Sequence, residues 1–134
     1  MRIDLARGDI LIPPDGVKLT VTGPAPTIAL DAGWGSTASA AFTSGSNDVR
    51  GRVTITSAGT GQAANAVATI TFAKAFATAP FAIVQIGGGT ERDTPTEQAL
   101  VALNYTTTTT TLAITNTDTI VAAETLIIDY LVIG

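Results

Sequence analysis

The chain has no cysteine and no histidine among its 134 residues. Disulfides, thiolate nucleophiles and metal sites built on Cys or His are therefore excluded. Histidine is also the commonest general base near neutral pH, so its absence removes the most frequent route to acid–base catalysis. We expect a fold that depends on packing and association, with no metal and no cofactor.

Charged residues are scarce too, at 13% of the chain, where globular domains carry about 25%. The net charge is −4, and the seven basic residues are scattered. Because no basic run is available to neutralise phosphates, we expect no nucleic-acid partner. Contiguous neutral patches on small proteins commonly mark contacts. The low charge density therefore indicates a surface partly hidden against other subunits.

Long hydrophobic runs are lacking as well. A membrane-spanning helix needs about 20 apolar residues, whereas the stretch 126–133 is much shorter and contains Asp129. Residues 1–16 alternate charged and apolar side chains and include Pro13 and Pro14, unlike the continuous apolar core of a signal peptide. We expect a soluble protein with no membrane partner and no classical export.

The residues that are abundant favour β-strands. Thr, Val and Ile recur along the chain, and β-branched side chains suit a pleated backbone. Short runs bounded by Gly, Pro, Asn, Asp or Ser return at roughly ten-residue spacing, which is typical of a β-sandwich or barrel. Alternation is clearest around Val53 and Ile55, and again at Ala68, Ile70 and Phe72. The pattern predicts strands over residues 17–22, 26–30, 52–56, 66–72, 81–86, 99–105, 112–116 and 125–133.

The N-terminal third is lean in apolar bulk. Residues 31–48 are rich in Gly, Ser and Ala, with Trp34 and Phe42 as their only large side chains. Such a segment cannot build a core alone, so we expect it to lie along another surface. We therefore predict an extended arm over residues 1–45 and a compact β domain over 46–134. The arm residues expected to dock on a partner are Ile3, Leu5, Ile10, Leu11, Ile12 and Trp34.

Two predicted strands are apolar on both faces. Residues 81–86 are so except at Gln85, and residues 125–133 are so except near Asp129. A strand that is apolar on both sides needs cover on both sides. One side faces the core, and the other is expected to meet a neighbouring subunit. The residues predicted for this subunit interface are Leu126, Ile127, Leu131 and Ile133.

Catalytic motifs are not evident. Gly87–Thr90 is glycine-rich but lacks the Lys-Ser/Thr pair and the following helix of a phosphate-binding loop, so a flexible loop is favoured. No serine lies in a Gly-x-Ser-x-Gly turn, and Lys18 and Lys74, the two lysines that could activate one, are expected at the surface. The acids are too dispersed for a pair across a sugar-binding groove. We predict that the protein is not an enzyme.

One acidic cluster is a candidate for calcium. Glu91, Asp93 and Glu97, with Asp48, could supply oxygen ligands. Their spacing lacks the regular alternation of a calcium loop, and Arg92 interrupts it. A solvated loop or a salt bridge between subunits is the favoured interpretation.

Two further positions have a structural interpretation. Trp34, the only tryptophan, is expected to pack the arm rather than to stack on a sugar. Asn47 and Asp48 are residue types that readily bond their side chains to nearby backbone. We predict that they form a structural corner where the chain enters the β domain.

Three segments carry a family likeness. Residues 45–56 (GSNDVRGRVTIT) resemble the "G-S-N-D-x-x-G-x-V-T-I-T" opening of a small jelly-roll module found in structural proteins of tailed bacteriophages. Residues 68–80 (ATITFAKAFATAP) are similar to its "A-T-V-T-F-A-x-A-[FY]-A-x-A-P" segment, and residues 130–134 (YLVIG) to its "Y-x-V-I-G" terminus. Residues 26–33 echo the linker before the module, so the likeness covers about residues 26–134.

This resemblance implies a jelly-roll-type β-sandwich that assembles as a homotrimer. Proteins of this kind are capsid decoration proteins, head fibres or tail-fibre tips. Because few residues precede the module here, we expect a decoration protein that binds the major capsid protein on the outer surface of the head. It would be made in the host cytoplasm and carried on the virion. The alternatives are a receptor-binding or tail-fibre tip module attached to tail proteins, and a module that binds a glycan of the host surface.

Overall fold

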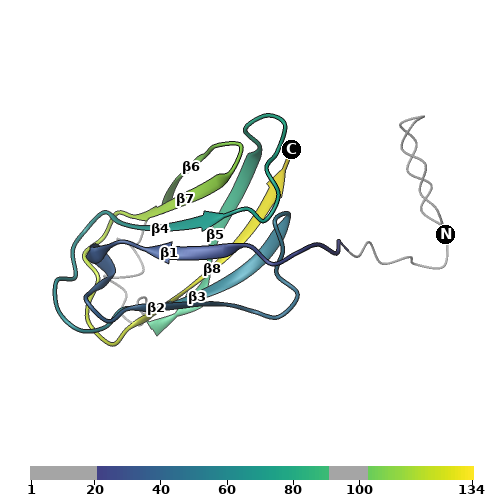
Figure 1. Ribbon diagram of the computed structural model, residues 1–134. Coiled ribbons are helices and arrows are strands. Elements are labelled where there is room, and N and C mark those ends of the chain that lie inside the picture. Colours follow the sequence, from purple (N-terminus) through teal and green to yellow (C-terminus); the bar gives the residue numbers. More distant parts are fainter. Residues whose placement is uncertain (1–20, 91–102) are drawn as a thin grey trace, which may run out of the picture.

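Two antiparallel four-stranded sheets pack face to face in the computed structural model, which describes residues 21–90 and 103–134 (Figure 1). The first sheet has the order β1-β4-β7-β6, with β1 Thr27–Leu30, β4 Ala66–Thr71, β7 Thr111–Asn116 and β6 Leu103–Thr107. The second has the order β2-β3-β8-β5, with β2 Ser39–Phe42, β3 Arg50–Thr56, β8 Thr125–Ile133 and β5 Phe81–Gly89. A short 3-10 helix, η2 (Ala32–Trp34), connects β1 to β2. The predicted all-β sandwich is confirmed.

The strands pair as two ribbons, each folded across both sheets. In the first ribbon β1 pairs with β4 and β2 pairs with β3, and in the second β5 pairs with β8 and β6 pairs with β7. The two ribbons join through β3–β8 in one sheet and β4–β7 in the other. Non-local pairings of this kind hold together residues far apart in the chain: Arg52, for example, lies opposite Asp129.

The core lies between the sheets and follows from the period of two along each strand. Val53 and Ile55 of β3 and Ala68 and Ile70 of β4 are buried, while their neighbours in the chain face outward. These positions agree with the alternation read from the sequence. The buried hydrophobic residues are Trp34, Val53, Ile55, Ala66, Ala68, Ile70, Phe72, Ala82, Leu112, Ile114, Ile120, Leu126, Ile128, Tyr130 and Val132.

Most predicted strands are confirmed within the described ranges, including those at 26–30, 52–56, 66–72, 81–86 and 125–133. In the threonine tract at 106–111, residues 108–110 form the turn between β6 and β7, and the other threonines end the two strands. Residues 21 and 22 are not in a strand. The remainder of the predicted strand at 17–22 lies outside the described residues, as do 99–102.

The boundary predicted at residue 45 differs from the structure. The segment 27–42 supplies an edge strand to each sheet, β1 and β2, and Trp34 between them is 1% exposed within the core. An edge strand pairs on one side only, so β2 can be built from Ser, Ala and Phe. These residues therefore belong to the sandwich rather than to an arm.

Strand β5 also extends further than predicted. Gly87, Gly88 and Gly89 were expected in a flexible loop, but all three belong to β5. Gly87 lies at a bulge between Ile86 and Gly88, and Gly88 and Gly89 continue the pairing with β8. Gly88 and Gly89 have φ values of 141° and 120°, a region that glycine adopts without strain. The glycine run thus serves the bulge. In the described part of the chain, no helix is long and apolar enough to cross a membrane.

Candidate interaction surface

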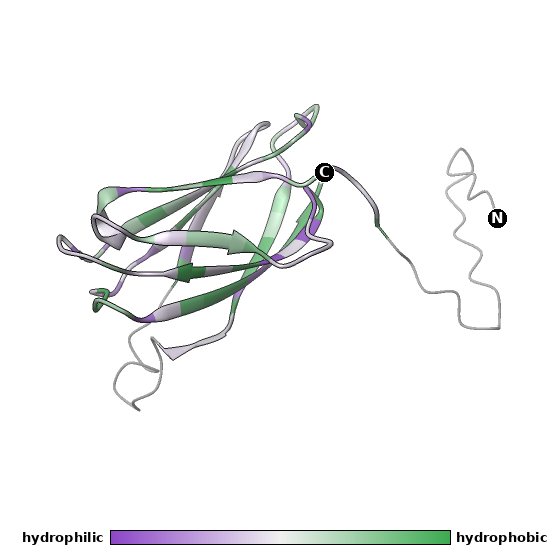
Figure 2. Cartoon of the chain, turned by 60° about the horizontal axis from the view of Figure 1, so that its bottom comes forward, coloured by the Kyte–Doolittle hydropathy of each residue, from purple (hydrophilic) through white to green (hydrophobic). Residues whose placement is uncertain are grey.

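The last strand sorts its apolar side chains onto two faces. Leu126, Ile128, Tyr130 and Val132 of β8 are buried between the sheets. Ile127, Asp129, Leu131 and Ile133 point to the outer face of the sheet β2-β3-β8-β5. Figure 2 shows that strongly hydrophilic residues are few along the strands of this sandwich.

An apolar patch covers one end of that outer face. Phe81 lies opposite Ile133, and Ile83 lies opposite Leu131, in the register of β5 with β8. Their exposed fractions are 84% for Phe81, 58% for Ile133, 57% for Ile83 and 39% for Leu131. We call these four residues the apolar patch. Large apolar side chains gathered on adjacent strands in this way characterise protein–protein contact sites.

Beside the apolar patch, Arg52 and Asp129 lie opposite each other on β3 and β8 and form an ion pair. Arg52 of β3 donates to Asp129 of β8 through Nε–Oδ1 at 2.6 Å and Nη2–Oδ2 at 2.8 Å. This two-pronged geometry is the strongest form of an arginine–carboxylate contact. The hydrogen bond from Arg52 holds the pKa of the Asp129 carboxyl below its usual value, and the same bond raises the pKa of Arg52. Gln85, opposite Asp129 on β5, lowers the pKa of this carboxyl further.

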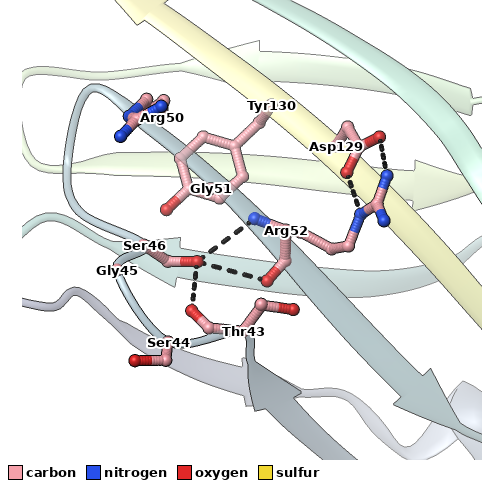
Figure 3. Close-up of a pocket in the computed structure, with 9 residues that line it drawn as sticks. All are labelled: Thr43, Ser44, Gly45, Ser46, Arg50, Gly51, Arg52, Asp129 and Tyr130. Atoms are coloured by element: carbon pink, nitrogen blue, oxygen red, sulfur yellow. Dashed lines mark hydrogen bonds and ion pairs between the residues drawn. The ribbon is translucent and has the colours of Figure 1, made fainter. Parts of the chain in front are cut away.

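A shallow pocket lies beside Arg52, and its lining includes Ser46, Gly51 and Tyr130 (Figure 3). Several polar groups of this lining are hydrogen-bonded to other groups of the same chain. Ser46 Oγ donates to the carbonyl of Thr43 at 2.7 Å and accepts from the amide of Arg52 at 3.2 Å. The Tyr130 ring lies over Gly51, where a Cβ would collide with it. The pocket is thus the tightly bonded rim of the strand pair β3–β8, and its residues do not resemble a catalytic set.

Asn47 and Asp48 form the predicted corner, and the structure shows how. Asn47 Oδ1 accepts from the amides of Val49 and Arg50 at 2.9 and 3.1 Å, and its Nδ2 donates to the carbonyl of Val21 at 3.0 Å. Asp48 accepts from the backbone amides of Ala73 and Lys74 at 2.7 and 2.9 Å. The pair therefore ties together the incoming chain, the start of β3 and the connection after β4.

This use of Asp48 bears on the calcium alternative. Both carboxylate oxygens of Asp48 already accept backbone hydrogen bonds. Within residues 21–90 and 103–134, no three acidic side chains come together as metal ligands. Glu91, Asp93 and Glu97 lie outside the described residues.

The structure separates the residues predicted for the subunit interface. Leu131 and Ile133 lie in the apolar patch, and Ile127 is half-buried on the same outer face. Leu126 is a correction, because it faces the opposite sheet and is buried in the core, where no other subunit can reach it.

Phe81 and Ile83 were not predicted for this surface, although residues 81–86 showed the same two-sided apolar pattern as the last strand. The pattern that could have indicated Phe81 and Ile83 is this two-sided apolar character, which the strands at 81–86 and 125–133 share. Only the register of β5 with β8 places Phe81 beside Ile133.

The residues predicted to dock the arm also need a correction. Trp34 is buried in the sandwich core and cannot contact the capsid or another partner. The described residues do not include the other five, which are Ile3, Leu5, Ile10, Leu11 and Ile12.

Comparisons with protein-family models, with curated proteins and with solved structures found no match to this chain.

Proposed function

We propose that this protein is a non-enzymatic structural protein of a tailed-bacteriophage particle, which assembles as a homotrimer and decorates the outer surface of the head. The observation that carries the proposal is the apolar patch on a chain with so few charged residues. An exposed aromatic and three exposed aliphatic side chains on adjacent strands are best explained by cover from other subunits. The assignment to a phage particle is supported by the likeness of residues 45–56, 68–80 and 130–134 to phage modules.

The jelly-roll type belongs to the same proposal in a broad sense. Jelly rolls wrap paired strands over two sheets. This chain wraps two ribbons of four strands in a comparable manner, with β1–β4 and β5–β8 as the outer pairs. This folding of paired strands over both sheets is the feature that supports the jelly-roll type.

The energetics of the apolar patch suit association. Fully burying a side chain of this size stabilises by about 1.5–3 kcal/mol, whereas association costs roughly 4–15 kcal/mol in lost freedom. The four side chains are already partly buried, so their contribution only approaches that cost. A stable trimer therefore needs contact surface beyond the apolar patch.

The proposed mechanism is mechanical. A ligand that binds only the assembled state of a shell stabilises that state by mass action. A trimer that bridges several copies of the major capsid protein would therefore oppose expansion of the shell. The protein then acts through its copy number and its contacts, with no chemistry of its own.

Quantitative mass spectrometry of purified particles tests this function. Hundreds of copies per particle would support decoration of the head. A few copies, up to a few tens, would move the protein to the tail and favour the tail-fibre tip instead. Absence from particles, or specific glycan binding by the isolated protein, would contradict the proposal. Light scattering of the purified chain should give three times its mass of 13.6 kDa.

A further inference from the structure

Phe81 is the most exposed large hydrophobic residue in the described part of the chain, at 84%. It begins β5 directly after the buried Pro80 and stands on the outer face beside Ile133. Its ring is left almost uncovered by its own chain. In protein interfaces, aromatic side chains of this kind are the anchors that fill a pocket on the partner.

A groove at the same end of the sandwich offers such a pocket. Its volume is about 530 Å³, and its apolar wall includes Val21, Val49, Phe76, Ala77 and Gly134. Gly134 follows Ile133, the strand partner of Phe81, so the groove and the apolar patch adjoin at the C-terminal end of β8. Phe81 does not line the groove of its own chain. We call this cavity the Phe76 groove.

The Phe76 groove is held open by contacts on its own walls. The ring of Phe76 packs edge-on against Phe72, with centroids 4.9 Å apart at 82°. The amide of Phe76 donates to the carbonyl of Thr109 at 2.8 Å, and Asp48 fixes the amides of Ala73 and Lys74. A preformed groove binds without a further ordering cost.

The electrostatics of both surfaces favour a second copy of this chain as the occupant. The apolar patch has no ionised group, and the adjoining Arg52 and Asp129 neutralise each other. In the Phe76 groove, Asp48 and Lys74 carry opposite charges, and the Asp48 carboxylate is engaged with backbone amides. Two copies can therefore meet here without burying an unpaired side-chain charge, which would be costly.

We propose that Phe81 of one copy inserts into the Phe76 groove of the next copy. The two surfaces are different parts of the molecule, so the contact is head-to-tail and can close into a ring. The inference rests on the self-association in the proposed function and adds its pairing. It also supplies the contact surface that the apolar patch alone lacks.

Disulfide trapping tests the pairing, since the chain has no cysteine of its own. The single variants Phe81→Cys and Ala77→Cys, carried on chains of different mass, are mixed, unfolded, refolded together and mildly oxidised. The expected product is a disulfide between residue 81 of one chain and residue 77 of another, identified by peptide mass spectrometry. Each variant alone should give little dimer, because a disulfide needs Cα atoms within about 7 Å.

Three results would overturn the pairing. They are an efficient 81–81 disulfide in Phe81→Cys alone, no 81–77 disulfide in a mixture that keeps its oligomeric mass, and an intrachain disulfide in the double variant Leu19→Cys/Ala77→Cys. The last result would show that the groove holds the N-terminal segment of its own chain.

A matched pair of serine variants separates this contact from the proposed function. Phe81→Ser should lower the oligomeric mass in light scattering, whereas Val121→Ser should not, because Val121 is an exposed apolar side chain, at 53%, that lies outside both surfaces. A monomeric wild-type chain would contradict self-association itself. A wild-type oligomer that Phe81→Ser leaves intact would contradict only this contact.

Discussion

The hydroxyl of Tyr130 donates a 2.7 Å hydrogen bond to the backbone carbonyl of Asn47, and so joins the last strand to the corner before β3. The ring of Tyr130 crosses Gly51 on the neighbouring strand and meets the edge of Phe42 at 6.3 Å between centroids. One side chain thus connects β8, β3, β2 and the corner. Substitutions that alter one of these contacts at a time therefore measure what each contributes to the free energy of unfolding.

Tyr130→Phe should destabilise the fold by about 1–3 kcal/mol. The substitution keeps the ring but leaves the buried carbonyl of Asn47 without this donor. Urea denaturation measures the free energy of unfolding. Tyr105→Phe is the control, because Tyr105 is 45% exposed, and surface substitutions usually change stability by less than about 0.5 kcal/mol. Equal effects of the two variants would contradict this role for the hydroxyl.

Alkaline pH should weaken the wild type more than Tyr130→Phe. Burial raises the pKa of Tyr130 above its ordinary value of 10.0, with the charge of Asp48 as a further cause. Above pH 10.0 the unfolded chain has lost this proton while the folded chain keeps it, so stability falls as pH rises. The slope from this group is about 1.4 kcal/mol per pH unit. Denaturation curves of both proteins on either side of pH 10.0 measure it, and parallel pH profiles would contradict the prediction.

Gly51→Ala should cost about 1–3 kcal/mol through overpacking. A Cβ at residue 51 meets the ring and hydroxyl of Tyr130, which is held by Asn47 and cannot move aside cheaply. Gly23→Ala is the matched control, since its Cβ would come no closer than 3.6 Å to Asn47 Cβ. Thermal unfolding followed by circular dichroism compares the two. A neutral Gly51→Ala would show that the ring has room to shift.

Trp34→Ala should destabilise the isolated chain by about 3–5 kcal/mol, the usual cost of deleting a large buried aromatic side chain. If Trp34 acted in docking to a shell, the isolated chain would keep its stability. Phe81→Ala, in the exposed apolar patch, is the comparison and should change the stability of the monomer little. Chemical denaturation below the association concentration measures both variants.

Acid should remove the contribution of the ion pair between Arg52 and Asp129. The native pKa of Asp129 is lowered, chiefly by the hydrogen bond from Arg52. Stability from this group is therefore present above its ordinary value of 3.8 and lost as pH falls through the lower native value. The difference in melting temperature between wild type and Asp129→Asn should shrink in acid and in high salt. In the background of Arg52→Ala the same substitution should show a much smaller pH dependence, because the chief cause of the lowered pKa is gone.

Much of the fold could be predicted because alternation is a local property of a strand. Val53 and Ile55, and likewise Ala68 and Ile70, show it plainly, and both pairs are buried as predicted. Strand β2 was not predicted because its sequence, Ser-Ala-Ala-Phe, carries too little apolar bulk to show a period. Strand β1 was predicted as an extended segment but placed in the arm, because nothing local shows that it pairs with β4. The glycines that extend β5 have no side chains to alternate at all.

The sequence by itself determined that the chain is all-β, that its strands alternate, and that its last strand has more apolar surface than one core can bury. Only the tertiary structure decided that Leu126 faces inward, that Trp34 fills the core, and that Phe81 stands beside Ile133 at the surface. The physical reason is range. Alternation is set by neighbours in the chain, whereas the order of the strands in a sheet depends on pairings between distant segments, which the alternation along one strand does not specify.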